Sequence, residues 1–207
     1  DRMTNGACIQ LGVGGMPDAI GKLIAESELK DLGIHTELLV NAYLDMHKAG
    51  KITNLNKHDI MRGKSVFSIA HGTKELFDWV SDNPSMCCAP INYVNDLSVI
   101  GEIDNFVSIN SCIAVDLFGQ ISAESAGTRH ISGTGGQLDF LTAGFKNPRA
   151  QSFIALPSTY TDKKGNLHSN IKPTFTGGDI ITDPRSQAYT MVTEYGIENL
   201  AGASVWE

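Results

Sequence analysis

Short apolar runs alternate along the chain with segments in which apolar residues recur at helical spacing. The first run, residues 7–13, predicts a buried strand, and residues 17–29 carry apolar side chains three and four positions apart, which predicts a helix. The same two patterns recur toward the end of the sequence. They predict strands over 34–40, 65–70, 87–94, 151–156 and 189–194, and helices over 41–49, 73–80 and 135–145.

One segment departs from this alternation. Residues 106–117 and 120–124 alternate apolar and polar positions on either side of Phe118 and Gly119, which predicts an antiparallel hairpin. Strands that alternate with helices favour an α/β fold, here a mostly parallel sheet flanked by helices on both faces, with the hairpin as an insertion. Ligands of such sheets bind beyond the carboxyl ends of the strands, so polar residues there are the candidates for chemistry.

Two glycine-rich turns lie where a strand gives way to a helix. The first is Gln-Leu-Gly-Val-Gly-Gly-Met-Pro-Asp-Ala-Ile-Gly at 10–21, and the second is Ser-Gly-Thr-Gly-Gly-Gln-Leu-Asp-Phe at 132–140. The first N–H groups of a helix have no partner within it, so such a turn can hold an anion or an oxyanion. Glycines that serve only close packing are the alternative interpretation.

Neither turn carries a standard nucleotide motif. A dinucleotide fingerprint that starts at Gly12 and Gly14 would need glycine where Pro17 stands. A phosphate-binding P-loop would need Ser or Thr after Lys22, where the chain has Leu23. These mismatches argue against a nucleotide-binding domain of either type.

Composition and charge narrow the class of protein. The chain has 207 residues and a formal charge of −7, with 42% hydrophobic and 19% charged residues, as in ordinary globular proteins. No Lys/Arg cluster is large enough to track a nucleic-acid backbone, and no apolar stretch is long enough to cross a bilayer. We therefore expect a small-molecule ligand, with neither a nucleic acid nor a membrane as partner.

The cysteines and histidines add little to the assignment of a function. The four cysteines form no Cys-x-x-Cys pair and mostly lie in apolar runs, which indicates buried reduced thiols, and the histidines lack metal-ligand spacing, so no metal is expected. The first residues lack the basic start and apolar middle of a signal peptide, so we expect a cytoplasmic protein. Both ends look like cuts, which indicates a fragment of a longer chain.

Glu37 stands out because it lies inside the apolar run 34–40. A carboxylate is costly to bury unless it is paired, so this side chain either faces solvent or is retained for a purpose. Alternating strands often carry a charge on the solvent side, and the pattern alone favours that exposed position.

Six motifs, in order and spanning nearly the whole chain, resemble the C-terminal domain of the acetyl-CoA hydrolase/transferase family. Within that family the likeness is greatest to 4-hydroxybutyrate and butyrate–acetate CoA-transferases. The motifs are LGVGGMPDAI at 11–20, LGIHTEL at 32–38, VSINSC at 107–112 followed by VDLFGQ at 115–120, ISGTGGQLDF at 131–140, IALPST at 154–159 and VTEYGI at 192–197. The resemblance implies that residues 1–207 are the C-terminal CoA-transferase domain of a longer, two-domain chain.

The resemblance also implies a mechanism. Glu37 would attack an acyl-CoA thioester, and a glutamyl-CoA thioester on Glu37 would then carry CoA from a short-chain acyl-CoA, of the 4-hydroxybutyryl or butyryl class, to a carboxylate such as acetate. Backbone N–H groups of Val13 and Gly136 would form the oxyanion hole. Further residues that would bind substrate or CoA are Gly14, Gly15, Asn95, Gly135 and Glu194. The resemblance implies that Asn95 positions the catalytic glutamate or the bound acyl group.

The implied partners follow from this chemistry. Coenzyme A would be a substrate, with no cofactor bound permanently, and the other partners would be the carboxylate, the chain's own N-terminal domain and further copies in a homo-oligomer. Asn41-Ala42 departs from the Asp-Gly pair of many relatives, which puts the acyl preference in doubt.

Alternatives remain open at this point. The protein could be an acetyl-CoA hydrolase, or a non-catalytic domain that binds an anion or nucleotide at the glycine turns. Asn95 could instead cap a helix over 96–100, Glu194 could be structural, and His35 could be a hydrogen-bonded structural histidine.

Overall fold

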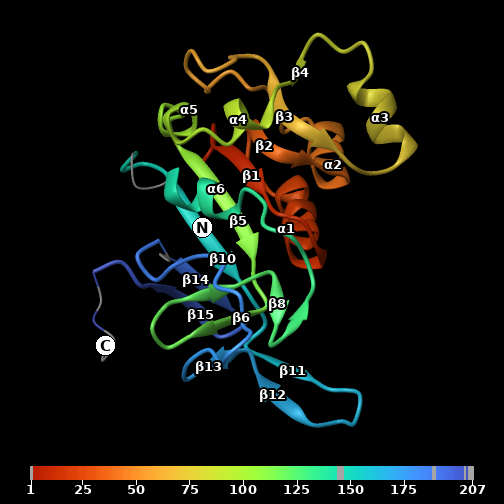
Figure 1. Cartoon of the computed structure of the whole chain (residues 1–207). Coiled ribbons are helices and arrows are strands. Elements are labelled where there is room, and N and C mark those ends of the chain that lie inside the picture. Colours follow the sequence, from red (N-terminus) through yellow and green to blue (C-terminus); the bar gives the residue numbers. More distant parts are fainter. Residues whose placement is uncertain (1, 144–146, 188–189, 203, 205–207) are drawn as a thin grey trace.

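A large, mostly parallel sheet forms the centre of the protein (Figure 1). The computed structural model describes residues 2–143, 147–187, 190–202 and 204. Eight strands run in the order β15-β14-β10-β5-β1-β2-β3-β4, and β15 is antiparallel to β14 while the other neighbours are parallel. The strands are β1 (Cys8–Leu11), β2 (Gly33–Leu39), β3 (Ser65–Ala70), β4 (Met86–Cys88), β5 (Phe106–Ser111), β10 (Gln151–Ala155), β14 (Thr190–Thr193) and β15 (Gly196–Asn199).

The order of the strands reverses between β1 and β5. The chain builds outward from β1 through β2 and β3 to β4, then returns to place β5 on the other side of β1. In such sheets the connections diverge at the reversal and leave a crevice beyond the carboxyl ends of the two strands. The topology therefore places a ligand site at the ends of β1 and β5.

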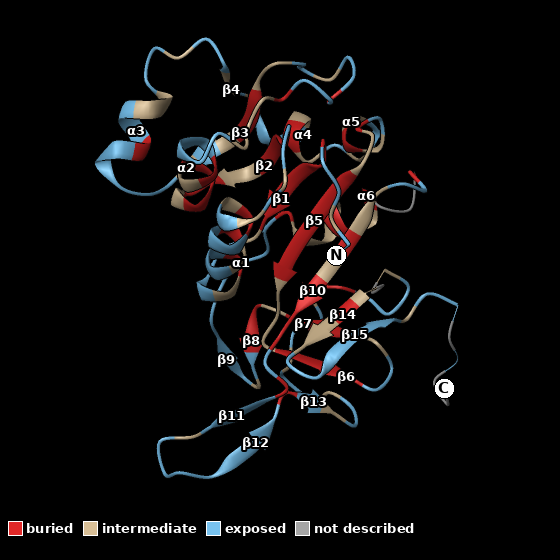
Figure 2. Ribbon diagram, turned by 180° about the vertical axis from the view of Figure 1, so that it is seen from behind, coloured by how far each residue is buried: buried red, intermediate tan, exposed pale blue. Residues whose placement is uncertain are grey.

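Helices cover both faces of the sheet, as the sequence predicts. One face carries α1 (Gly15–Glu26), α2 (Asn41–Lys48) and α3 (Lys74–Val80), and the other carries α4 (Ile91–Val94), α5 (Leu97–Gly101) and α6 (Gln137–Ala143) (Figure 1). Each face of the sheet has its own hydrophobic core, and successive residues of a strand point into opposite cores. Ile9 packs against the layer of α1, α2 and α3, and Cys8 packs against the layer of α4, α5 and α6. Figure 2 shows the central strands buried between these two layers.

Smaller sheets lie beyond the carboxyl ends of β5 and β10 (Figure 1). The predicted hairpin is confirmed in one of them, where β6 (Ala114–Asp116) pairs antiparallel with β7 (Ile121–Ser122). The Asp116 carboxylate closes its turn by accepting from the N–H groups of Phe118 and Gln120. The remaining short strands are β8 (Ser125–Ala126), β9 (Arg129–His130), β11 (Thr159–Thr161), β12 (Leu167–Ser169) and β13 (Ile171–Lys172).

Two predicted elements are wrong in part. The continuous strand expected over 106–117 is divided, because residues 106–111 form β5 of the main parallel sheet and only the later residues enter the hairpin. The extended segment expected over 87–94 stops at Cys88, since Pro90 starts the single turn of α4 and buries Val94 against the sheet.

The other elements lie where they are expected, with ends that differ by a few residues. Helix α1 begins at Gly15 rather than Pro17 and ends at Glu26, where Ser27 caps it by donating from its hydroxyl to the carbonyl of Ile24. Predicted positions 144, 145 and 189 lie outside the described residues. Within the described part of the chain, no helix combines the length and apolar character that crossing a bilayer requires.

Candidate active site

Glu37 lies near the carboxyl end of β2 and is half-buried. Strand geometry places it on the same face as His35, which is the face covered by α4, α5 and α6. The exposed position that the strand pattern favours is therefore wrong. The side chain points into a crevice instead of into open solvent, because the helices of this layer begin and end around it.

Asn95 holds the Glu37 carboxylate. Its Nδ2 group donates to Oε2 of Glu37 across 2.9 Å. Asn95 follows the last turn of α4, and His35 fixes that turn by bonding through Nε2 to the carbonyl oxygen of Val94 at 2.8 Å. The helix that follows is capped by Asp96, which accepts from the N–H of Ser98, so the capping role considered for Asn95 is wrong.

The second glycine turn presses against the same carboxylate. A β-carbon at Gly136 would overlap both Oε2 of Glu37 and Nδ2 of Asn95, and one at Gly135 would lie 3.7 Å from Oε1 of Glu37. Position 136 therefore has to be glycine for the main chain to come this close. Its N–H group precedes α6, where the first amides of a helix are free to bind a ligand.

The first glycine turn reaches the same crevice from β1. Gly14 adopts φ 120°, a left-handed conformation that side chains rarely adopt, and this lets the chain turn directly from β1 into α1. Among the described residues, no hydrogen bond uses the N–H of Val13 or of Gly136. The structure thus brings two unengaged amides and the Glu37 carboxylate to one site.

A second carboxylate, Asp139 of α6, shares Asn95 with Glu37. Nδ2 of Asn95 lies 3.4 Å from Oδ2 of Asp139. Burial raises the pKa of Asp139, the bond from Asn95 lowers it, and the negative charge of Glu37 raises it further, with a net upward shift. One amide therefore separates two carboxylates that would otherwise repel each other.

Glu37 and residues of the two glycine turns line a pocket of about 390 Å³ at the reversal point of the sheet. The ends of β1 and β5 supply one part of its wall, including Val13 and Asn110, and the turn before α6 supplies another. Gln10 and Asn110 form a reciprocal amide pair at the strand ends, with bonds of 3.0 and 2.9 Å. The pocket is large enough for a short acyl group beside Glu37.

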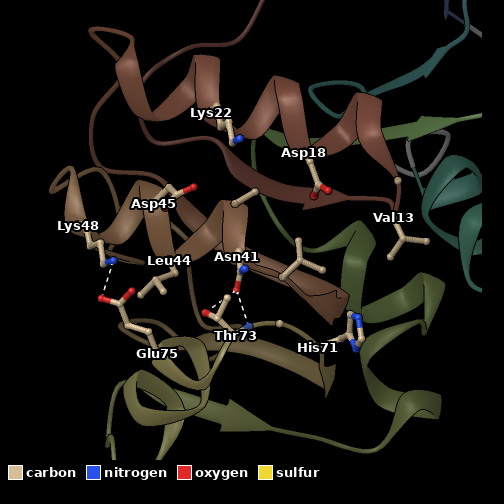
Figure 3. A pocket seen from close by; sticks show the side chains of 14 residues that line it. Val13, Asp18, Lys22, Asn41, Leu44, Asp45, Lys48, His71, Thr73 and Glu75 are labelled. Atoms are coloured by element: carbon tan, nitrogen blue, oxygen red, sulfur yellow. Dashed lines mark hydrogen bonds and ion pairs between the residues drawn. The ribbon is translucent and has the colours of Figure 1, made fainter.

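A second hollow, of about 680 Å³, adjoins this pocket at Val13 (Figure 3). Gly14 lines it, together with residues of α1, α2 and the start of α3. Figure 3 shows Val13 and His71 at one end and the ion pair of Lys48 and Glu75, at 2.6 Å, at the other. A long substrate that reacts at Glu37 could extend past Val13 into this hollow.

Comparisons with known proteins give the family of the chain. A family model described as the acetyl-CoA hydrolase/transferase C-terminal domain matches residues 72–207. The chain belongs to the acetyl-CoA hydrolase/transferase family. It is 53% identical, over all of its 207 residues, to a butyryl-CoA:acetate CoA-transferase of Anaerostipes caccae, and it covers 46% of that protein. The chain thus spans about half the length of the curated relatives it matches.

Two solved structures have the same fold as this chain. The 4-hydroxybutyrate CoA-transferase of Porphyromonas gingivalis superimposes with a TM-score of 0.80 at 37% identity, over 99% of this chain and 46% of that one. RipA from Yersinia pestis superimposes with a TM-score of 0.88 at 38% identity, over 98% of this chain and 44% of that one. The predicted α/β fold and the family resemblance are both confirmed.

Two residues considered as substrate ligands lie elsewhere. Glu194 is exposed and lines neither hollow; it accepts from the N–H of Ser158 at 2.9 Å and from its hydroxyl at 2.5 Å, bonds that lower the pKa of its carboxyl. Gly15 opens α1 and also lines neither hollow. The substrate-binding roles of the site residues in this family member stay predictions.

Several polar residues of the pocket are absent from the sequence-based prediction. Gln137 and Glu124 line the pocket, and Gln137 donates from Nε2 to Oδ2 of the buried Asp183 across 2.6 Å. A signal for Gln137 and Asp139 was present in the sequence, since both follow the second glycine turn in the first turn of a predicted helix. The sequence contained no such signal for Glu124 or Asp183.

Among the described residues, no group of three or more His, Cys, Asp or Glu is placed to bind a metal ion.

Proposed function

We propose that this chain is the C-terminal half of a CoA-transferase that moves CoA between a short-chain acyl-CoA and a carboxylate such as acetate. The observation that carries the proposal is the position of the Glu37 carboxylate, held by Asn95 beside the unengaged N–H of Gly136. The similarity to a butyryl-CoA:acetate CoA-transferase and to a 4-hydroxybutyrate CoA-transferase supports acyl groups of four carbons.

The first half of the reaction forms two covalent intermediates on Glu37. A carboxylate oxygen of Glu37 attacks the thioester carbon, and collapse of the adduct expels CoA thiolate and leaves an acyl-glutamyl anhydride. The thiolate then attacks the glutamyl carbonyl, which releases the first carboxylate and leaves a glutamyl-CoA thioester. Thioester energy is thereby kept in a covalent bond to the protein.

The second half reverses these steps with the acceptor. The incoming carboxylate attacks the glutamyl-CoA carbonyl, forms a new anhydride and expels CoA thiolate. Attack of the thiolate on the new acyl carbonyl gives the product acyl-CoA and free Glu37. No net proton is taken up or released, so the site needs no general acid or base, in keeping with a nucleophile surrounded by amides.

Each addition places negative charge on a carbonyl oxygen that the two glycine turns would stabilise. The N–H groups of Val13 and Gly136 are the donors, and loss of one such donor typically lowers the rate by about a hundred- to a thousandfold. The hollow beyond Val13, which Gly14 also lines, would take the remainder of the CoA molecule. An N-terminal half, as long as that of the relatives, would close over the exposed side.

Intact-mass measurement of the full-length protein mixed with butyryl-CoA tests the mechanism. We expect a CoA-sized adduct that acetate discharges and that is absent in Glu37→Gln. Borohydride should remove the adduct by reducing the glutamyl thioester to an alcohol with release of CoA thiol, which leaves the protein unable to form the adduct again. Glu26→Gln on the surface of α1 is a matched control and should form the adduct normally. Turnover without any adduct on Glu37 would contradict the proposal.

The same preparation separates the alternatives. A hydrolase releases CoA thiol from acyl-CoA at the same rate with or without acetate, because water discharges the glutamyl thioester. A transferase requires the acceptor acid. A non-catalytic domain would bind CoA equally well after Glu37→Gln and would form no adduct.

A further inference from the structure

Glu124 is a second carboxylate of the pocket that holds Glu37. It lies between β7 and β8 and is 6% exposed. Thr134 donates from its hydroxyl to Oε2 of Glu124 at 3.0 Å, and the N–H groups of Ile131 and Ser132 donate to its carbonyl oxygen. The bond from Thr134 holds the side chain, and the two N–H groups hold the backbone, of Glu124 beside the second glycine turn.

A third carboxylate lies behind this wall. Asp183 is fully buried, and within the described residues its Oδ1 has no hydrogen-bond partner, while Oδ2 accepts only from Gln137. Burial raises the pKa of Asp183 to about 6, with a bond from Gln137 that lowers it and the charge of Glu124 that raises it. The field in this part of the pocket is therefore negative.

In the part of the chain that the structure describes, no cationic side chain lines the pocket to offset these charges. Glu37 and Glu124 are the charged side chains that line it, and Lys, Arg and His are absent from the lining among the described residues. A carboxylate that enters this space needs a basic or N–H partner to offset the loss of water. The two glycine-turn amides are committed to the reacting carbonyl oxygen.

We propose that Glu124 makes this pocket select acyl groups with a neutral end, alkyl or hydroxyalkyl, and reject acyl groups that end in a second carboxylate. The inference rests on the CoA-transferase function proposed above. A terminal hydroxyl can donate to Glu124, because no hydrogen bond in the described part of the chain engages its Oε1. A terminal carboxylate would instead be repelled, by about a hundredfold in rate for charges about 6 Å apart at an effective dielectric constant of about 20.

Acetate escapes this penalty for a chemical reason. Acetate arrives when Glu37 is a glutamyl-CoA thioester, so the Glu37 side chain then carries no charge. The single carboxylate of acetate is the attacking group and is directed at that thioester. A dicarboxylate presents the same attacking group and a second one that must remain in the pocket beside Glu124. The discrimination therefore acts on the far end of the chain and leaves the reacting end unaffected.

The test compares donors in the full-length protein. Transfer to acetate is measured from butyryl-CoA, 4-hydroxybutyryl-CoA and succinyl-CoA, and kcat/KM for succinyl-CoA should be about a hundredfold below that for the other two. Glu124→Gln keeps the bond from Thr134 and removes the charge; it should raise the succinyl-to-butyryl ratio by at least about tenfold. Glu28→Gln is the control: it removes one negative charge from the surface, away from the pocket, and should leave the ratio unchanged.

Each result decides between the possibilities. Equal use of succinyl-CoA and butyryl-CoA by the natural protein, or an unchanged ratio in a folded Glu124→Gln variant, would overturn the inference while the transferase function stands. Absence of acetate-dependent transfer from butyryl-CoA would overturn the proposed function itself, and the inference with it. A melting temperature for Glu124→Gln within a few degrees of the natural protein verifies that the variant is folded.

Discussion

Asn95 and Glu37, 58 positions apart in the sequence, are joined by a 2.9 Å hydrogen bond from the side-chain amide to the carboxylate. The bond orients one lone pair of the carboxylate and leaves Oε1 beside Gly135. It also links β2 to the end of α4, so the position of a candidate nucleophile depends on the packing of a one-turn helix. The expected effects of changes at the site follow from this dependence.

Removing the amide should slow the chemical step. In Asn95→Ala the carboxylate loses a charge-assisted hydrogen bond, so we expect kcat for transfer from butyryl-CoA to acetate to fall by about ten- to a hundredfold. Asn95→Asp should be worse at neutral pH, since it adds a carboxylate between Glu37 and Asp139. Steady-state kinetics, with adduct formation by mass, measures both; full activity of Asn95→Ala would show that the bond has no part in the reaction.

A methyl group at position 136 should be severely damaging. Gly136→Ala drives a β-carbon into the Glu37–Asn95 pair, and a displacement of about 1 Å in a reacting group can cost about a hundredfold in rate. Gly177→Ala is the matched control, because a β-carbon there meets no atom within 4 Å. We expect the control to retain its kcat/KM, and equal activity in the two variants would mean that the turn relaxes without consequence.

His35 should act through α4. Its pKa is lowered to about 4, chiefly by burial, so the ring is neutral at pH 7 and donates from Nε2 to Val94. His35→Gln can keep a donor there, while His35→Leu cannot, and we expect kcat to fall by about tenfold in the leucine variant alone, with KM for acyl-CoA little changed. An equal fall in kcat in both variants would indicate that the ring contributes through packing and not through its hydrogen bond.

The buried Asp183 should make stability depend on pH. Its pKa is about 6 in the folded protein and 3.8 in the unfolded chain, so between these values the folded state holds a proton that the unfolded state releases. The contribution is present below pH 3.8 and is lost as pH rises to about 6, with an upper limit of about 3 kcal/mol.

Urea unfolding at intervals between pH 4 and pH 7 measures this effect. Asp183→Asn should remove this contribution, so its free energy of unfolding should rise relative to that of the natural protein between pH 4 and pH 6, while exposed Asp59→Asn should not. The lowered pKa of His35 makes the stability of all these proteins rise over the same range, so the difference between the profiles is the quantity to compare. A difference between the two profiles that does not grow between pH 4 and pH 6 would contradict the assignment. Glu124 and Cys112 are the other titratable groups coupled to Asp183.

Local patterns in the sequence were sufficient for most of the scaffold. The apolar runs of β1 and β3 and the helical spacing of α1 are visible without any tertiary information, because burial on both faces of a parallel strand requires consecutive apolar residues. The pattern failed at residues 87–94, where Pro90 and the sheet together favour one turn of helix over an extended chain. It also missed β11, β12 and β13, whose two or three residues are largely exposed and carry no period.

The sequence by itself determined the glycine turns, the strand that carries Glu37 and the family to which the chain belongs, since each depends on residues adjacent in the chain. Only the tertiary structure decided that Glu37 faces a pocket and that Glu124 enters the same space, and it chose between the two roles considered for Asn95, a contact with Glu37 and a helix cap. The physical reason is that parallel strands bring their carboxyl ends together from distant parts of the chain. The partners of a polar side chain at that edge are fixed by packing across the sheet, which leaves no periodic trace in the sequence.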